Sequence, residues 1–211
     1  MLGYVCKYTP MELFEAMDTE ITRLEPSVTD FNHADTLMHA NICSYTKAVL
    51  EDVMEHDYEG VILTTCCDSI RRLYDTLKSQ FPDKFFFLLD IPRKFNDFAV
   101  ALYERQLKQM LTEYEAFSGK TLDLKRFVSM MQNKAALKKQ ENTRMSSSAV
   151  SEKGNGQKLN IGIMGARCNN EIRQLLVDRG ANLLFDLTCT GLARDFSITE
   201  DQSCILMLPR C

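Results

Sequence analysis

The fold class is decided by one stretch of the chain, which reads Gly60-Val61-Ile62-Leu63-Thr64-Thr65-Cys66-Cys67-Asp68-Ser69-Ile70-Arg71-Arg72-Leu73-Tyr74-Asp75. Its first six residues are mostly apolar or β-branched, which is typical of a buried strand in a parallel sheet. Beyond the two cysteines the spacing becomes helical, with Asp68 as the expected N-cap of a helix that runs to about residue 80. A strand that passes directly into a helix is the unit from which α/β folds are built.

The same alternation continues on both sides of this stretch. Thr9 is the expected N-cap and Pro10 the expected first residue of the first helix, and Gly119 is expected to end the longest helix. We expect strands over residues 2–7, 21–24, 60–65 and 84–89, and helices over 11–17, 44–56, 68–80, 96–117 and 124–140. The pattern predicts an α/β protein whose first domain, residues 1–141, is a Rossmann-like or flavodoxin-like parallel sheet.

A change of composition marks the end of this first domain. Residues 142–158 contain a run of three serines and a Gly-Asn-Gly sequence but no Leu, Ile or aromatic residue, so we expect a flexible linker there. A second βαβ pattern follows, with strands over 159–164 and 182–187, a helix over 169–179 and a short strand over 205–208. The second domain, residues 159–211, has only about 53 residues, fewer than a doubly wound domain usually needs. We therefore expect a partial α/β domain, either truncated or completed by a partner.

Charge and hydropathy exclude two classes of partner. The 211 residues carry a net charge of −4, so no basic field is available to bind nucleic acid or an anionic membrane surface. The longest purely apolar run, Phe85 to Leu89, is far shorter than the roughly 18 residues of a spanning helix. The N-terminus lacks the pattern of a secretory signal, which makes the cytoplasm the expected location.

The cysteines are a notable feature of a chain expected in the cytoplasm. Disulfides do not persist in that reducing compartment, so frequent cysteines there point to metal or redox chemistry. There are eight, at positions 6, 43, 66, 67, 168, 189, 204 and 211. Cys66 and Cys67 follow an expected strand, Cys189 follows another, and Cys43 precedes an expected helix at Ser44. Ligands of open α/β sheets bind beyond the carboxyl ends of strands, and helix N-termini favour thiolates.

Spacing alone leaves several interpretations open. Thiolates from separate loops suit a zinc ion or an iron-sulfur cluster, but the paired C-x2-4-C spacing of structural zinc sites is absent. Buried or chemically idle thiols are the alternative, and we expect that of Cys6 and Cys204, which lie in apolar runs. Ser44 either hydrogen-bonds a cluster sulfide or the substrate, or simply caps its helix.

Four stretches in order carry a resemblance to a known family. They are Gly3-Tyr4-Val5-Cys6-Lys7-Tyr8-Thr9-Pro10-Met11-Glu12, Asn41-Ile42-Cys43-Ser44, the stretch 60–75 quoted above, and Asp186-Leu187-Thr188-Cys189-Thr190-Gly191. Together they resemble the 2-hydroxyacyl-CoA dehydratase family, which includes benzoyl-CoA reductase-type subunits and double-cubane cluster proteins. The chain would then be a family member that is truncated at its carboxyl end.

This resemblance implies an oxygen-sensitive protein with a 4Fe-4S cluster, or an 8Fe-9S cluster in the double-cubane relatives. In the dehydratases an ATP-dependent activator protein delivers one electron, and a ketyl radical of the acyl-CoA substrate then loses its 2-hydroxyl group. By position, Cys43 matches the family's first ligand, Cys67 its second and Cys189 the cysteine of its threonine-glycine motif. Cys66 is the additional cysteine of the Cys-Cys-Asp variant, which favours the double-cubane branch.

The expected function is thus that of an iron-sulfur lyase subunit, paired with a homologous subunit and acting on a 2-hydroxyacyl-CoA. The family's further ligand lies nearer the carboxyl end, where Cys204 and Cys211 do not match it. The alternative is a non-catalytic electron-transfer subunit or a double-cubane cluster-carrying reductase subunit. A third interpretation is a fragment without function that has inherited its cysteines.

Overall fold

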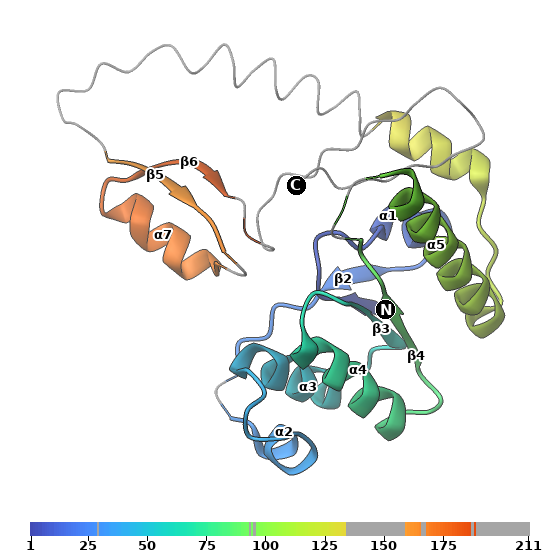
Figure 1. Cartoon of the computed structure of the whole chain (residues 1–211), viewed down its shortest axis with the longest axis horizontal. Helices are drawn as coiled ribbons and strands as arrows, with labels where there is room; N and C mark the ends of the chain where they lie inside the picture. The colour runs from blue at the N-terminus through green and yellow to red at the C-terminus, as the bar shows by residue number, and fades with distance from the viewer. Residues whose placement is uncertain are drawn as a thin grey trace.

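A parallel four-stranded sheet forms the centre of the computed structural model, which describes residues 1–28, 30–92, 94, 96–133, 159–165, 168–186 and 188 (Figure 1). Its strands are β1 (Leu2–Tyr4), β2 (Ile21–Arg23), β3 (Gly60–Thr64) and β4 (Phe85–Leu89). They lie in the order β2-β1-β3-β4 with every pair parallel. The expected α/β class is confirmed, and this order is the flavodoxin-like one, because a Rossmann sheet begins in the order 3-2-1-4.

Helices cover both faces of the sheet. One face carries α1 (Met11–Ala16), α5 (Asp97–Ser118) and the helical residues 124–133, and the other carries α2 (Asn32–Leu37), α3 (Ser44–Glu55) and α4 (Asp68–Gln80) (Figure 1). The alternation along β3 explains the two layers, since Ile62 packs with α1 and α5 while Val61 and Leu63 pack with α3 and α4. A sheet buried on both faces accounts for the continuous apolar strands in the sequence.

Two helix starts differ from expectation by one residue. Pro10, not Thr9, is the N-cap of α1, because the Met11 amide bonds the Thr9 carbonyl in a turn (2.9 Å) before the helix begins. Cys67, not Asp68, is the N-cap of α4, because its backbone is still extended (φ −156°, ψ 167°). Asp68 is therefore the first helical residue, where its carboxylate interacts favourably with the positive end of the helix dipole. The short helix α2 was not expected at all.

The long helix α5 begins and ends as the sequence predicts. The Asn96 side chain accepts a hydrogen bond from the Ala99 amide (2.8 Å), and Gly119 adopts the left-handed conformation (φ 71°) that ends the helix. The buried Phe85, Phe86 and Phe87 belong to the core, and Cys6 is buried as expected. Among the described residues no helix is long and apolar enough to cross a bilayer.

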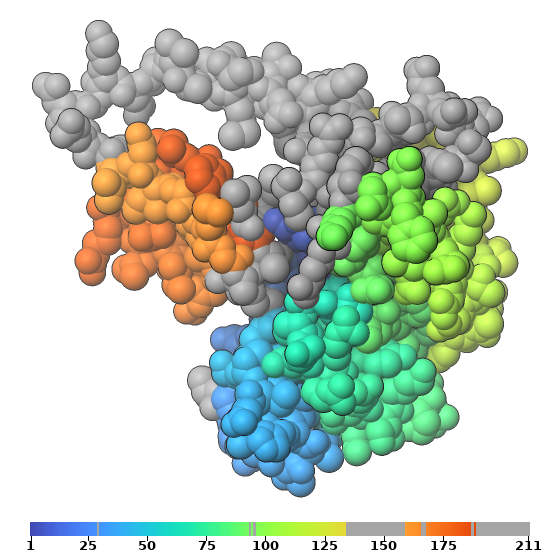
Figure 2. Space-filling model, viewed as in Figure 1, coloured from blue at the N-terminus to red at the C-terminus, as the bar shows by residue number. Residues whose placement is uncertain are grey.

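A second, smaller unit follows in the chain. It consists of β5 (Asn160–Ile163), α7 (Asn170–Asp178) and β6 (Asn182–Asp186), with the two strands parallel. Figure 2 displays it in orange as a lobe of its own. None of the residues of α7 is buried, and Ile172 and Leu175 are about half exposed, so the described part of this unit holds little core. The expected linker 142–158 and the expected strand 205–208 lie outside the described residues.

Candidate thiol site

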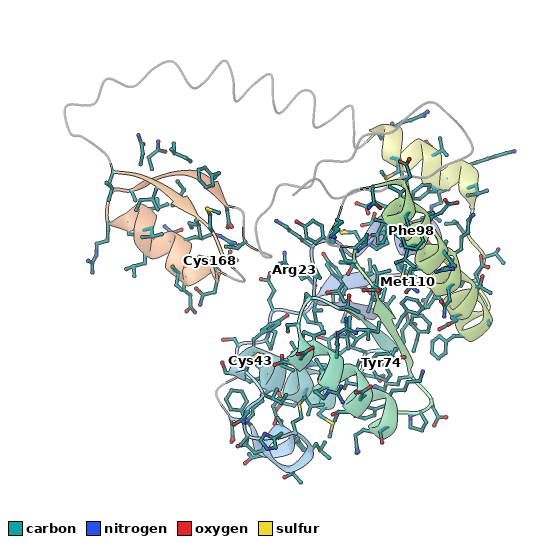
Figure 3. All side chains as sticks on the ribbon, viewed as in Figure 1. Arg23, Cys43, Tyr74, Phe98, Met110 and Cys168 are labelled. Atoms are coloured by element: carbon teal, nitrogen blue, oxygen red, sulfur yellow. The ribbon has the colours of Figure 1, made fainter. Side chains whose placement is uncertain are left out.

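The topology brings two helix N-termini to one edge of the sheet. Helix α3 runs into β3, so its first residue lies at the carboxyl end of the parallel strands, and α4 leaves β3 from this same end. Cys43 is the N-cap residue of α3, and Cys67 is the N-cap residue of α4. Both helices pack on one face of the sheet, and Figure 3 labels Cys43 where α3 begins. Two positive helix ends therefore meet beside these thiols.

The five described cysteines fall into two groups by exposure. Cys43, Cys66 and Cys67 are exposed free thiols, whereas Cys6 and Cys168 are buried. A buried thiol surrounded by apolar groups behaves as a small hydrophobic residue, while an exposed thiol beside a helix N-terminus is available for metal binding. The three exposed thiols thus form the candidate site, which we call the thiol edge.

Cys43 has a pKa below the ordinary value of 9.0. Partial burial acts to raise this pKa, but hydrogen bonds to the thiolate outweigh it. They come from the Thr46 hydroxyl, 3.2 Å from Sγ, from the Ser69 hydroxyl on α4, and from the backbone amides of Thr46 and Tyr45. These hydrogen bonds therefore make the thiolate of Cys43 more favourable than that of an ordinary cysteine.

Cys67 has a pKa above 9.0. Partial burial is the main cause, the Ile70 amide opposes it, and the neighbouring Cys66 and Cys43 add to it. Since like charges disfavour each other, the influence of Cys66 and Cys43 means that the three thiols share one electrostatic environment. Binding a cation would relieve the repulsion that these thiols meet on ionising, and thiolates are the ligands that iron-sulfur clusters and soft metal ions prefer.

The loop that carries Cys66 and Cys67 is fixed by the neighbouring strand. The Thr65 hydroxyl donates to the Asp90 carboxylate (2.5 Å), and the Thr65 amide donates to the Leu89 carbonyl (3.0 Å). The Ile91 amide in turn donates to the Thr65 hydroxyl (3.4 Å). Because Thr65 immediately precedes Cys66, these bonds hold the ends of β3 and β4 together just before the thiols.

Two residues whose hydroxyl groups hydrogen-bond Cys43 were not predicted from the sequence. Thr46 is fully buried, and Ser69 reaches Cys43 from the neighbouring helix. Thr46 follows the N-cap by three residues, a recurrent capping distance that could have drawn attention to it. Ser44, the residue expected to act beside Cys43, is exposed and is not among the groups that hydrogen-bond the Cys43 sulfur. Its expected catalytic role therefore stays a prediction.

The roles of Thr46 and Ser44 can be separated by thiol reactivity. In metal-free protein, Thr46→Val removes a hydroxyl that favours the thiolate, so the pKa of Cys43 should rise toward the ordinary value and its reaction with iodoacetamide should need a higher pH. Ser44→Ala is the matched control and should leave the midpoint of the pH-rate profile unchanged. Peptide mass spectrometry would follow the alkylation of Cys43, and equal profiles for the two variants would contradict this assignment.

In the second unit, hydrogen bonds and an ion pair fix the carboxyl end of strand β6. Asp186 accepts hydrogen bonds from the Thr188 amide (2.8 Å) and hydroxyl (2.5 Å), and pairs with Arg173 of α7 (2.6 Å). Partial burial acts to raise the pKa of Asp186, but Thr188 and Arg173 together hold it below its usual value. Cys189 follows Thr188 in the sequence. Cys189, Cys204 and Cys211 lie outside the described residues, so their predicted roles are not tested.

In the part of the chain that the structure describes, no group of three or more His, Cys, Asp or Glu side chains is already arranged around a single metal position. The carboxyl edge of an open parallel sheet is nevertheless where α/β proteins bind their ligands, and helix N-termini there favour thiolates.

The family follows from comparison with known proteins. Residues 6–150, more than half of the chain, match the family described as 2-hydroxyglutaryl-CoA dehydratase, D-component. The chain belongs to this family, which confirms the resemblance that the sequence motifs indicated. No curated protein matches the chain. Dehydratases are hydro-lyases, and the word component implies that family members work with partner subunits.

Proposed function

We propose that the chain is an iron-sulfur subunit of a 2-hydroxyacyl-CoA dehydratase-type lyase. The observation that carries this proposal is the meeting of Cys43, Cys66 and Cys67 at the carboxyl edge of the sheet, with two helix N-termini behind them. Membership of the dehydratase family supplies the reaction class. If these three thiols were buried, they would not be available to bind a cluster.

Cys43, Cys66 and Cys67 would hold a 4Fe-4S or double-cubane cluster, together with Cys189 from the second unit. Such a cluster, when bound, supplies a single low-potential electron for removal of the 2-hydroxyl group from the acyl-CoA thioester. Thiolate ligands suit iron-sulfur chemistry, and exposure leaves room for an open position.

The chain's own residues prepare the site in three ways. The hydrogen bonds of Thr46 and Ser69 favour the Cys43 thiolate and fix its direction. The Thr65–Asp90 bond holds the Cys66-Cys67 loop against β4. The N-terminal dipoles of α3 and α4 offset part of the negative charge, which lowers the cost of assembling several thiolates. Ser44 is exposed beside Cys43, where its hydroxyl could meet the substrate.

The proposed partners follow from this reaction. They are an acyl-CoA substrate, an ATP-dependent activator protein that delivers the electron, and a paired homologous subunit. The described part of the second unit has little core of its own and exposes apolar residues such as Leu184 and Phe185, which a partner subunit would cover.

One observation favours a second candidate function. Cys66 directly precedes Cys67 and is exposed as well, so the loop offers two thiols where one would suffice for a single cluster. A double-cubane cluster-carrying reductase subunit, or an electron-transfer subunit without a substrate site, would use both.

Anaerobic purification tests the proposal. The protein should be brown, should absorb broadly in the visible range, and should contain about equal amounts of iron and acid-labile sulfide. With the activator and ATP it should convert a 2-hydroxyacyl-CoA to the enoyl-CoA. A colourless, iron-free protein would exclude the cluster, whereas bound cluster without turnover would favour the electron-transfer function.

A further inference from the structure

Glu51 is a buried carboxylate in the middle of α3. Only 2% of its surface is exposed, although burial of a charge is costly unless hydrogen bonds compensate for it. Both of its oxygens contact α2. Oε1 accepts a hydrogen bond from the Ala34 amide (2.7 Å), and Oε2 lies 2.7 Å from Nδ1 of His33. The carboxylate is therefore satisfied by a neighbouring helix rather than by solvent.

The bond to the Ala34 amide replaces a missing cap. The N-cap residue of α2 is Phe31, whose side chain has no hydrogen-bond acceptor. Ala34 is the third helical residue, so its amide is one of those that an N-cap side chain usually binds. A helix of six residues is also too short to be stable in isolation. The N-terminal end of α2 therefore depends on Glu51.

A second contact joins the two helices nearer to the thiol edge. The Lys47 ammonium lies 2.5 Å from the Asp35 carboxylate, and only 12% of the Lys47 side chain is exposed. Cys43, Lys47 and Glu51 follow one another at intervals of four residues, so they lie along one face of α3. Glu51 thus holds α2 on this face, and Lys47 holds it one turn closer to Cys43.

Only a short segment leads from α2 to Cys43. Met38 ends α2, with its amide bonded to the Ala34 carbonyl (2.8 Å) and its side chain buried in the core. In the segment that follows, the Ile42 amide donates to the His39 carbonyl (3.0 Å). Because five residues take the chain from Met38 to Cys43, fixing α2 limits where the backbone that enters Cys43 can lie.

We infer that Glu51 is a positioning residue, which clamps α2 against α3 and thereby fixes the segment that delivers Cys43 to the thiol edge. Lys47 assists it from the same face of α3. Figure 1 shows α2 beyond α3, on the side away from the sheet, so the clamp acts from outside the core. Hydrogen bonds depend strongly on direction, and the clamp therefore fixes the register of α2 on α3. The inference rests on the proposed function only for what Cys43 binds.

Hydrogen exchange of the metal-free, full-length chain tests the clamp. In Glu51→Ala the Ala34 amide loses its acceptor, so the peptides that cover 32–42 should exchange at least about tenfold faster. The peptides that cover 60–80 should stay protected. Glu51→Gln keeps an oxygen for the Ala34 amide and should restore most of the protection. Glu55→Ala, at an exposed position of the same helix, is the matched control and should have no effect.

Binding of Co²⁺ to the metal-free chain tests whether the clamp positions Cys43. Thiolate ligands give bound Co²⁺ an absorption band whose intensity rises with their number, so the spectrum reports whether Cys43 takes part. Glu51→Ala should bind Co²⁺ about tenfold more weakly, with a band like that of Cys43→Ser, and Glu51→Gln should recover the original band. A band of full intensity in Glu51→Ala, or a loss of protection that spreads to 60–80, would overturn the inference.

A double variant decides if Glu51→Ala does not fold. His33→Ala with Asp35→Asn removes the contacts of two exposed side chains of α2 and leaves the interior of α3 unchanged. Exchange over 32–42 should then be about threefold faster than in the unaltered protein. The same exchange rate in both proteins would overturn the inference.

These measurements keep the two proposals apart. Hydrogen exchange needs no metal, so if the unaltered protein bound neither Co²⁺ nor iron, the proposed function would fail and the exchange rates alone would decide the clamp. Conversely, a brown protein in which Glu51→Ala changes neither the exchange rates nor the Co²⁺ band would retain the proposed function without this positioning role.

Discussion

Cys67→Ser should lose at least about tenfold in bound iron and nearly all visible absorption after anaerobic purification, since even outer-shell changes at metal sites cost that much. Cys67 is the N-cap of α4, and the Cys66 and Cys43 thiols interact with it. A serine hydroxyl fits the same space and can still cap the helix, but it does not ionise near neutral pH and is a poor ligand for iron. The loss would therefore report ligation rather than unfolding.

Cys204→Ser is the control for this substitution, because Cys204 matches no ligand position of the family. It should keep the iron content and the absorption spectrum of the unaltered protein. Circular dichroism should be the same for both variants. Equal iron in Cys67→Ser and the unaltered protein would mean that the thiol edge does not hold the metal.

The sequence predicted the fold class and the position of Cys66 and Cys67 between a strand and a helix because the signals for both are local. The apolar run from Gly60 to Thr64 and the helical spacing after it identify a buried strand and its crossover without knowledge of any distant contact. Parallel topology then places whatever follows the strand at the ligand-binding edge. Cys66 and Cys67 could thus be placed at that edge from the sequence, whereas their role as cluster ligands stays a prediction that rests on the family resemblance.

The parts that the sequence did not predict depend on distant contacts. Ser69 reaches Cys43 only because α3 and α4 pack side by side, and nothing near Ser69 in the sequence indicates this. Helix α2 was missed because six residues are too few to show a helical period, and its Ala34 amide is held by the Glu51 carboxylate of α3 (2.7 Å). Lys7 looked like the end of a strand, although its partner lies at Thr188.

Gly60→Ala should destabilise the protein by about 4 kcal/mol, at the upper end of single substitutions, because the added methyl group has no space. Gly60 lies opposite Phe85 in the β3–β4 ladder, and a Cβ built on it would come within 1.9 Å of the Phe85 carbonyl oxygen. The obstacle is backbone, so relief requires β4 to separate from β3. Strand separation would break the ladder that ends at Thr64 and Leu89 and, with it, the adjoining Thr65–Asp90 bond, so iron binding should weaken as well.

Gly3→Ala in the neighbouring strand is the matched control. A Cβ on Gly3 would come within 3.1 Å of the Leu24 side chain, which can turn aside, so this substitution should cost only about 1 kcal/mol. Urea unfolding followed by circular dichroism would give both free energies of unfolding, and similar values for the two variants would contradict the close approach of β3 and β4. The contrast matters for the site because the same tight pairing that excludes a methyl group at Gly60 aligns the carboxyl ends of β3 and β4. Precision at the thiol edge is then set six residues before Cys66, by the absence of a side chain at Gly60.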